Sequence, residues 1–517
     1  MATPGINTTP PLHMSLSLTH TRPILTMEQP FFPEEIWEKV FSHFLPVDCD
    51  GHEVCLDELL EDGEWIKEYL ARPSPDLLNV SRTSKKFHRI ADSLIYRNII
   101  VGKGFTRMRL ITTLIEQPAL RQHVRSLFNF EGYWYPEPTA EDLGTAYRAF
   151  LGAQSELGLT PKLREAFARG LQHAEDVQAQ QLLLVALCPR LEQLDLRCAF
   201  GTELAREVLR EVLKVCELPG KQAEGLLTTG HLSRLRKLRL IPVAGIPFSL
   251  PNLTTLVLKG GCGTPKQELG PIPKELELQH LNLVDPYLSQ ANLQQLLCRY
   301  PKLRLLQVKL SSSSEHSGTT ILQLGVALRG YGNYGNPSLE SLIIDNDGSR
   351  MMGRGQIGSL LPLCNLKRLS LSLEDLVGDI WNRWIEEGIV GNDASPLKLD
   401  EELPDSLETL EVQCHWKGSQ FDPLMSYLHY EVFSLISNGW PANLRRILLQ
   451  HYTNGPTLLS YTKNDGHPGW TLTIYESEEE MPVYDILDAC PMVEGGYLSV
   501  EYGTHVADTE PTVDGLW

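Results

Sequence analysis

The sequence predicts an α/β protein in which a module of three short helices precedes an irregular solenoid of short parallel strands with helices on its outer side. Helical spacing of apolar residues marks three segments between residues 33 and 95. A six-residue strand pattern then returns nine times between residues 191 and 449, with a proline two or three residues ahead of six copies. With 517 residues the chain exceeds one ordinary hydrophobic core, which favours an elongated array.

The first helix is expected over residues 33–45. Pro33 suits a first helical position, and Glu34 and Glu35 suit the positive end of a helix dipole. Pro46 stops the helix. Its apolar stripe is wider than one small core needs, and the members of the stripe are Ile36, Trp37, Val40, Phe41, Phe44 and Leu45.

Two further short helices are expected. Asp76 is predicted to cap a helix that carries Leu77, Leu78 and Val80, and Ser84 to cap the next one. The apolar residues of that third helix are Phe87, Ile90, Ala91, Leu94 and Ile95. A unit of about 50 residues buries too little of its surface to be very stable alone, so the excess apolar stripe predicts a partner helix.

The order of residues in these helices resembles an F-box of the fungal type. It reads Pro33-Glu34-Glu35-Ile36-Trp37, Val40, Phe44-Leu45, Leu77-Leu78-x-Val80-Ser81-Arg82, Lys86-Phe87 and Leu94-Ile95-Tyr96-Arg97. The resemblance implies that the module, residues 28–100, interlocks with a Skp-type adaptor and through it reaches a cullin. The docking residues that it implies are Pro33, Ile36, Trp37, Val40, Phe44, Leu45, Leu77, Leu78, Val80 and Phe87.

Residues 47–75 are a departure from the family pattern, which passes from the first helix to the second within a few residues. This insert is acidic and keeps apolar residues at helical spacing, from Leu59 to Leu70, so it is expected to form an extra surface helix. The alternative interpretation of the whole module is a helical cap on the repeat array.

The repeated strand pattern is Leu-x-x-Leu-x-Leu, with Ile or Val allowed. The nine copies are LEQLDL from Leu191, LRKLRL from Leu235, LTTLVL from Leu253, LQHLNL from Leu278, LRLLQV from Leu303, LESLII from Leu339, LKRLSL from Leu366, LETLEV from Leu407 and LRRILL from Leu444. This is the strand signature of leucine-rich repeats, which predicts a horseshoe-shaped solenoid over residues 181–450.

The spacing of the copies and the residues around them extend this prediction. Helices are expected ahead of the copies at 191, 303 and 444. The starts are 18 to 44 residues apart, against roughly 20–29 in regular repeats, so residues 311–338 and 374–403 are candidate loops. Residues 101–180 are expected to form a helical linker or N-terminal cap, and residues 451–517 a C-terminal cap or tail.

The concave face is expected to bind the protein target. The residues between and after the leucines point to this face, and seven of 27 are basic while three are acidic. The seven form a basic strip of Arg197, Lys237, Arg239, Lys259, Lys309, Arg368 and Arg446. The hypothesis is that the strip receives an acidic or phosphorylated segment of the target. Two alternatives stay open: a solvated face with chance charge, or pairing with the acidic residues 476–480.

The composition excludes several other functions. A formal charge of −19 argues against contact with nucleic acid or an anionic membrane, and no apolar run reaches the roughly 18 residues of a membrane span. Ten cysteines at uneven spacing fit reduced thiols in the cytosol or nucleus. Cys49, His52 and Cys55 lack a second pair of zinc ligands, so no metal is expected. Residues 1–27 are expected to be a disordered lead, with a mitochondrial presequence as the alternative.

These observations lead to a non-catalytic substrate adaptor of a Skp, cullin and F-box type ubiquitin ligase. Neither a phosphate-binding loop nor a nucleophile motif occurs in the sequence, so no catalytic or cofactor-binding residue is expected. The alternatives are a repeat-based interaction scaffold without a ligase role, and an enzyme in the insertions or the tail.

Overall fold

The computed structural model describes residues 33–42, 75–101, 105–129, 138–157, 159–174, 176–196, 232–240, 250, 252–260, 277–286, 288–310, 319–334, 337–346, 355–377, 399–414, 422–439, 441–451, 457–464, 469–475 and 498–503. The expected N-terminal lead 1–27 and all but the last residue of the acidic insert 47–75 lie outside these residues.

Three helices form the N-terminal module, as predicted: α1 (Glu34–Ser42), α4 (Pro75–Ser81) and α5 (Lys85–Ile95). Their buried residues form a hydrophobic cluster separate from the core of the sheet, made of Phe41, Leu77, Ile90, Ala91 and Leu94. Ser84 caps α5 by accepting a hydrogen bond from the Phe87 amide at 3.1 Å, as expected. Asp76 is not a cap, because α4 already begins at Pro75 and Asp76 lies in its first turn.

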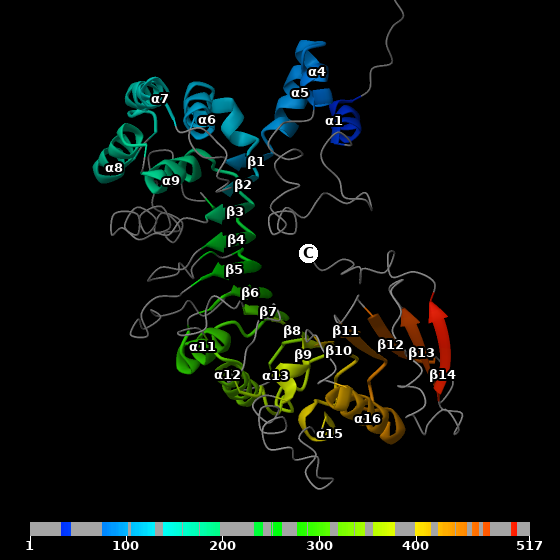
Figure 1. The fold of residues 1–517 in the computed structure, drawn as a ribbon. Helices are drawn as coiled ribbons and strands as arrows, with labels where there is room; N and C mark the ends of the chain where they lie inside the picture. The colour runs from blue at the N-terminus through cyan, green and yellow to red at the C-terminus, as the bar shows by residue number, and fades with distance from the viewer. Residues whose placement is uncertain are drawn as a thin grey trace, which may run out of the picture.

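The described strands form one open sheet of fourteen, in the order of the chain, and the predicted α/β class is confirmed (Figure 1). Strands β1 to β11 are all parallel, β12 is antiparallel to both of its neighbours, and β14 is parallel to β13. The strands are β1 (Asn98–Val101), β2 (Ser126–Asn129), β3 (Gln193–Leu196), β4 (Lys237–Leu240), β5 (Thr255–Lys259), β6 (His280–Val284), β7 (Leu305–Leu310), β8 (Ser341–Asn346), β9 (Arg368–Ser372), β10 (Thr409–Cys414), β11 (Arg446–His451), β12 (Thr457–Lys463), β13 (Trp470–Tyr475) and β14 (Leu498–Gly503).

The nine predicted strand segments are β3 to β11, and each strand begins at the third residue of its sequence motif. The fourth residue of every motif lies in one register column across the sheet. The side chains of this column are at most 3% exposed: Leu194, Leu238, Leu256, Leu281, Leu306, Leu342, Leu369, Leu410 and Ile447. Burying such a side chain contributes about 2–3 kcal/mol, so this column is a major source of cohesion between repeats.

Strands β1 and β2 were not predicted, and they extend the sheet toward the N-terminal module. In the region expected to be a helical linker, α6 (Phe105–Glu116), η1 (Pro118–Gln122), α7 (Ala140–Ala153), α8 (Pro161–Gln172) and α9 (Val177–Leu187) flank β2. The strand segment VRSLFN keeps the first two apolar positions of the motif, Val124 and Leu127, but has Asn129 at the third. The strict pattern therefore overlooks it.

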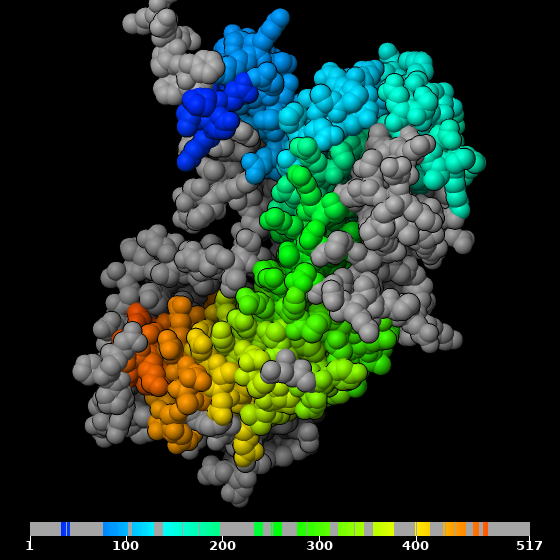
Figure 2. All heavy atoms as spheres, turned by 180° about the vertical axis from the view of Figure 1, so that it is seen from behind, coloured from blue at the N-terminus to red at the C-terminus, as the bar shows by residue number. Residues whose placement is uncertain are grey.

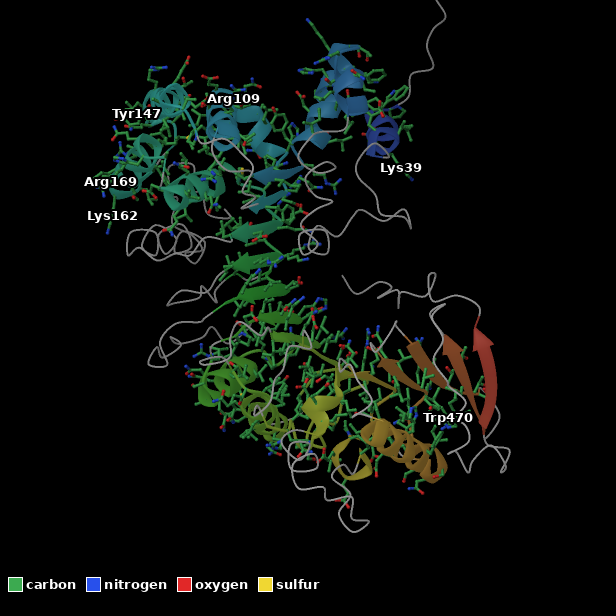
Figure 3. All side chains as sticks on the ribbon, viewed as in Figure 1. Lys39, Arg109, Tyr147, Lys162, Arg169 and Trp470 are labelled. Carbon is green, nitrogen blue, oxygen red and sulfur yellow. The ribbon has the colours of Figure 1, made fainter. Side chains whose placement is uncertain are left out.

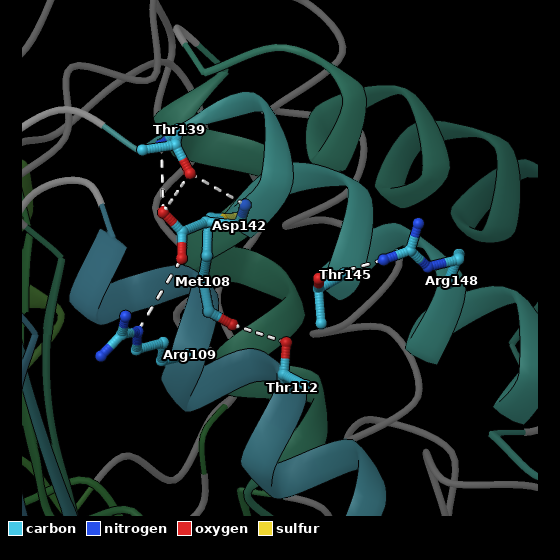
Figure 4. Close-up of polar contacts among 7 residues, drawn as sticks. All are labelled: Met108, Arg109, Thr112, Thr139, Asp142, Thr145 and Arg148. Carbon is cyan, nitrogen blue, oxygen red and sulfur yellow. Dashed lines mark hydrogen bonds and ion pairs between the residues drawn. The ribbon is translucent and has the colours of Figure 1, made fainter.

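An ion pair joins α7 to α6, and Figure 4 shows it beside the cap of α7. Thr139 and Asp142 form a capping box at the start of α7, in which the Thr139 hydroxyl accepts from the Asp142 amide at 3.1 Å. The Oδ1 atom of the Asp142 carboxylate lies 3.8 Å from Arg109 Nε on α6. The hydrogen bonds from Thr139 are the main reason that the pKa of Asp142 is lowered. The Asp142 carboxylate thus takes part both in the cap of α7 and in the ion pair to α6.

The other helices are α11 (Gln290–Cys298), α12 (Ile321–Asn333), α13 (Leu373–Val377), α15 (Leu399–Glu402) and α16 (Asp422–Asn438). In Figure 1 the sheet curves, and α11, α12 and α16 lie on its outer side. The helices expected ahead of the motifs at 191, 303 and 444 are α9, α11 and α16. The expectation of a loop over residues 311–338 was wrong for α12, which Thr320 caps. Its glycines allow close packing: a Cβ at Gly325 would lie 1.9 Å from the Ile357 carbonyl oxygen.

The C-terminal strands β12 to β14 continue the sheet instead of leaving it. Tyr461 and Leu472 are fully buried there, and Trp470, labelled in Figure 3, is 6% exposed. His429 of α16 forms a hydrogen bond with the Tyr461 hydroxyl at 3.1 Å. The described part of the region predicted to be a C-terminal cap or tail therefore contains antiparallel strands.

Candidate binding surfaces

Helix α1 divides its apolar residues between the core of the module and the solvent. Trp37 and Phe41 turn inward, where their ring centroids lie 4.9 and 5.3 Å from that of Phe87 on α5. Ile36 and Val40 turn outward and are 46% and 44% exposed. Because the two are four residues apart, they share one face of the helix. Ile36 and Val40 form a small apolar surface and are not part of the module's hydrophobic core.

The predicted docking residues that the structure describes fall into three groups by exposure. Pro33, Ile36 and Val40 are exposed, whereas Trp37, Leu78, Val80 and Phe87 are half-buried. Leu77 is 1% exposed, which corrects its expected place on the docking surface: its side chain fills the core between α4 and α5. Phe44 and Leu45 lie outside the described residues. An ion pair between Arg89 and Glu34 joins α5 to α1 and supports the orientation of the exposed face.

The module stands at one end of the repeat array. In Figure 2 the atoms of α1, α4 and α5, in blue, lie beyond the first strands and beside α6. Their separate hydrophobic cluster agrees with this arrangement.

Part of the predicted basic strip is not exposed. Arg239 lies in the middle of β4 and is only 5% exposed, which corrects its expected role as an accessible contact. Its register partner on β3 is Asp195, which is 2% exposed. Arg197 lies outside the described residues. Lys237 is half-buried, and Lys259 and Arg446 are exposed.

Two other members of the strip are bound to acids on neighbouring strands. Lys309 Nζ on β7 lies 3.4 Å from Asp345 Oδ2 on β8. Arg368 Nη2 on β9 donates to both carboxylate oxygens of Glu411 on β10, each at 3.0 Å. The pairing with Glu411 is favoured because both side chains are largely shielded, at 27% and 16% exposure. In this half of the sheet, acids thus neutralise Lys309 and Arg368.

A second basic surface, which the sequence interpretation missed, lies at the rim where the strands begin. Each strand is preceded by a residue whose amide donates to the same position of the previous repeat: Arg125 to Arg97, Glu192 to Arg125 and Arg236 to Glu192, at 2.6–2.8 Å. Arg190 and Arg234 stand two residues before the last two of these positions. We call Arg97, Arg125, Arg190, Arg234 and Arg236, with Glu192 among them, the rim cluster.

The arginines of the rim cluster act on one another electrostatically. Burial lowers the pKa of Arg125, the Glu192 carboxylate opposes this, and the charges of Arg190, Arg234 and Arg97 lower the pKa further. Arg125 Nη1 lies 3.4 Å from Glu192 Oε1. Arg190, Arg234 and Arg236 are exposed, and within the described part of the chain none has an ion pair. The sequence holds a signal for this surface, because Arg190 and Arg234 directly precede the strand motifs that begin at Leu191 and Leu235.

No group of three or more His, Cys, Asp or Glu side chains that could hold a metal ion occurs among the residues described. The candidate zinc residues Cys49, His52 and Cys55 are outside them. Burial raises the pKa of the Cys188 thiol to about 12, so this thiol is a poor nucleophile at neutral pH. None of the described helices is long and apolar enough to cross a membrane.

Comparison with family models and with curated proteins gives no match for this chain. Three surfaces of the described residues are candidates for binding: the apolar face of α1, the strip on the sheet and the rim cluster. The first is apolar and small, and the other two are charged. Surfaces of these kinds are suited to binding proteins.

Proposed function

We propose that the chain is the substrate-recognition subunit of a Skp, cullin and F-box type ubiquitin ligase. The observation that carries the proposal is the pair Ile36 and Val40 on α1, exposed on a three-helix module that has a hydrophobic core of its own. Two large apolar side chains on one exposed helix face favour association with another helix. A Skp-type adaptor is the partner that the F-box resemblance implies.

The repeats support the second half of the proposal. Nine leucine-rich motifs form consecutive strands of one curved sheet, and solenoids of this kind bind proteins on extended surfaces. Lys259 and Arg446 are the exposed members of the strip, and Lys237 is half-buried. The target is a protein, the adaptor itself performs no chemistry and uses no cofactor, and the complex acts in the cytosol or nucleus.

The test is co-purification of the full chain with a Skp-type adaptor. The double variant Ile36→Asp and Val40→Asp places two charges on the proposed contact, and we expect the bound adaptor to fall more than about tenfold, since desolvating one such charge costs more than 1.4 kcal/mol. The matched control is Leu151→Asp on α7, because Leu151 is 43% exposed and belongs to neither surface.

The folding of all variants is compared by circular dichroism. Failure of the folded wild-type chain to bind the adaptor contradicts the ligase proposal and favours a repeat-based scaffold. Equal loss in the Leu151→Asp control contradicts the assignment of the contact to α1.

A further inference from the structure

The rim cluster differs from the equivalent positions in later repeats. We call the residue directly before each strand its rim position. Two residues before the rim positions of β8 to β11, the chain has Ser338, Asn365, Ser406 and Asn443. Each of these side chains donates to a backbone carbonyl of the preceding repeat: Ser338 to Pro301, Asn365 to Pro337, Ser406 to Leu366 and Asn443 to Asp405, at 2.6–3.0 Å. Arg190 and Arg234 occupy this position before β3 and β4 and make no such bond within the described residues. At Arg190 and Arg234 the described part of the early repeats therefore lacks the side-chain to backbone hydrogen bond that stabilises the later repeats.

The rim cluster also has a larger net positive charge than the rim positions of β7 to β11. The rim positions Arg304, Glu340, Lys367, Glu408 and Arg445 of β7 to β11 alternate in sign, three positive and two negative, and Glu340 lies 3.7 Å from Arg304 and 3.4 Å from Lys367. The rim cluster has five arginines and one glutamate, which leaves four formal positive charges in a protein of net charge −19. Like charges so close together repel, and an added anion relieves that repulsion.

We infer that the rim cluster binds a phosphoryl group carried by a segment of a protein partner. The inference rests on the proposed function only in taking this partner to be the target of the ligase. The planar guanidinium group donates two parallel hydrogen bonds to phosphate oxygens, and a phosphoryl dianion neutralises two charges within a small volume, which a single carboxylate does not. A long nucleic-acid backbone is disfavoured because the rest of the chain is strongly acidic.

The test uses the full chain and a fluorescein-labelled peptide pool in which one central phosphoserine is flanked by randomised residues. Matched pools carry serine or glutamate at the central position. In fluorescence anisotropy at 0.1 M salt we expect the phosphoserine pool to bind at least about tenfold more tightly than either control pool. We expect R190E/R234E to weaken that binding about a hundredfold, since two charge-assisted contacts are lost and repulsion replaces them.

The matched control is R445E, because Arg445 occupies the same rim position as Arg236, is exposed and has no ion pair among the described residues. It should change the binding less than about threefold. Lowering the pH from 7.5 to 5.5 should weaken the phosphoserine pool, because the second phosphate proton binds with a pKa of about 6 while arginine keeps its charge.

Several results overturn the inference: equal binding of the glutamate pool, phosphoserine binding that R190E/R234E leaves unchanged, or tight binding of duplex DNA by the cluster in place of the peptides. Adaptor co-purification separates this outcome from failure of the proposed function. R190E/R234E should keep the adaptor and lose the phosphopeptide pool, whereas the Ile36→Asp and Val40→Asp variant should lose the adaptor and keep the pool.

Discussion

Strands β3 and β4 and strands β8 to β11 are built on the same column of buried leucines, yet their rims carry different chemistry. In the later repeats, Ser and Asn side chains bind the backbone of the preceding repeat, and acids pair with bases across neighbouring strands. In the early repeats, Arg190 and Arg234 stand in the place of those Ser and Asn residues, and Glu192 pairs with Arg125. The core of a repeat array is constrained by packing, whereas its rim is available for binding at some cost in stability.

The same contrast holds for the basic strip. Lys309 and Arg368, toward the C-terminal half, face acids on the next strand. The exposed arginines of the rim cluster have no such acids among the described residues. The location of unneutralised charge, more than the number of basic residues, therefore distinguishes a binding surface from a stabilising network.

The largest expected effect concerns what the two regions share. Leu194→Ala in β3 and Leu410→Ala in β10 should each lower the free energy of unfolding by about 3 kcal/mol, since both side chains lie in one continuous core and leave a cavity when shortened. Urea denaturation measures both, with exposed Leu361→Ala as the control, expected within about 0.5 kcal/mol. Two separate unfolding transitions would show that the halves fold independently.

A smaller effect distinguishes the two rims. Asn365→Ala and Ser406→Ala should each cost about 1 kcal/mol, because each removes a hydrogen bond between repeats. Arg190→Ala and Arg234→Ala should change stability by less than about 0.5 kcal/mol, or raise it, because they remove like charges. If the arginine variants destabilise the protein as much as the Asn and Ser variants, the arginines have a structural role and the contrast is lost.

The smallest effect tests the ion pairs. A double-mutant cycle with Arg368→Ala and Glu411→Ala should give a coupling energy of about 1 kcal/mol, because the contact is two-fold and partly shielded. The same cycle for Arg304 and Glu340, which are 3.7 Å apart and more exposed, should give less than about 0.5 kcal/mol. Equal coupling energies at 0.1 M and 1 M salt would argue that the Arg368 contact is not electrostatic.

Much of the fold follows from short-range patterns. The nine motifs predict β3 to β11, and helical spacing predicts α1, α4 and α5, because burial of alternate or periodic residues is a local property of the sequence. Strand β2 was missed because Asn129 replaces the third apolar residue, and α12 because its glycines and the adjacent serines indicated a loop. In α12, Gly325 and Gly332 lie against Ile357 and Pro362, and Gly330 lies against Gln294 of α11.

The sequence by itself determined the parallel α/β class, the strand positions and the apolar surplus on α1, since each depends on spacing within a few residues. Only the tertiary structure decided which charges are available. Burial of Arg239, the pairing of Arg368 with Glu411 and the approach of Arg97, Arg125, Arg190 and Arg234 to one another depend on strand register between segments up to 137 residues apart, from Arg97 to Arg234. Charge interactions fall off with distance, so their strength is set by that register and not by residue type alone.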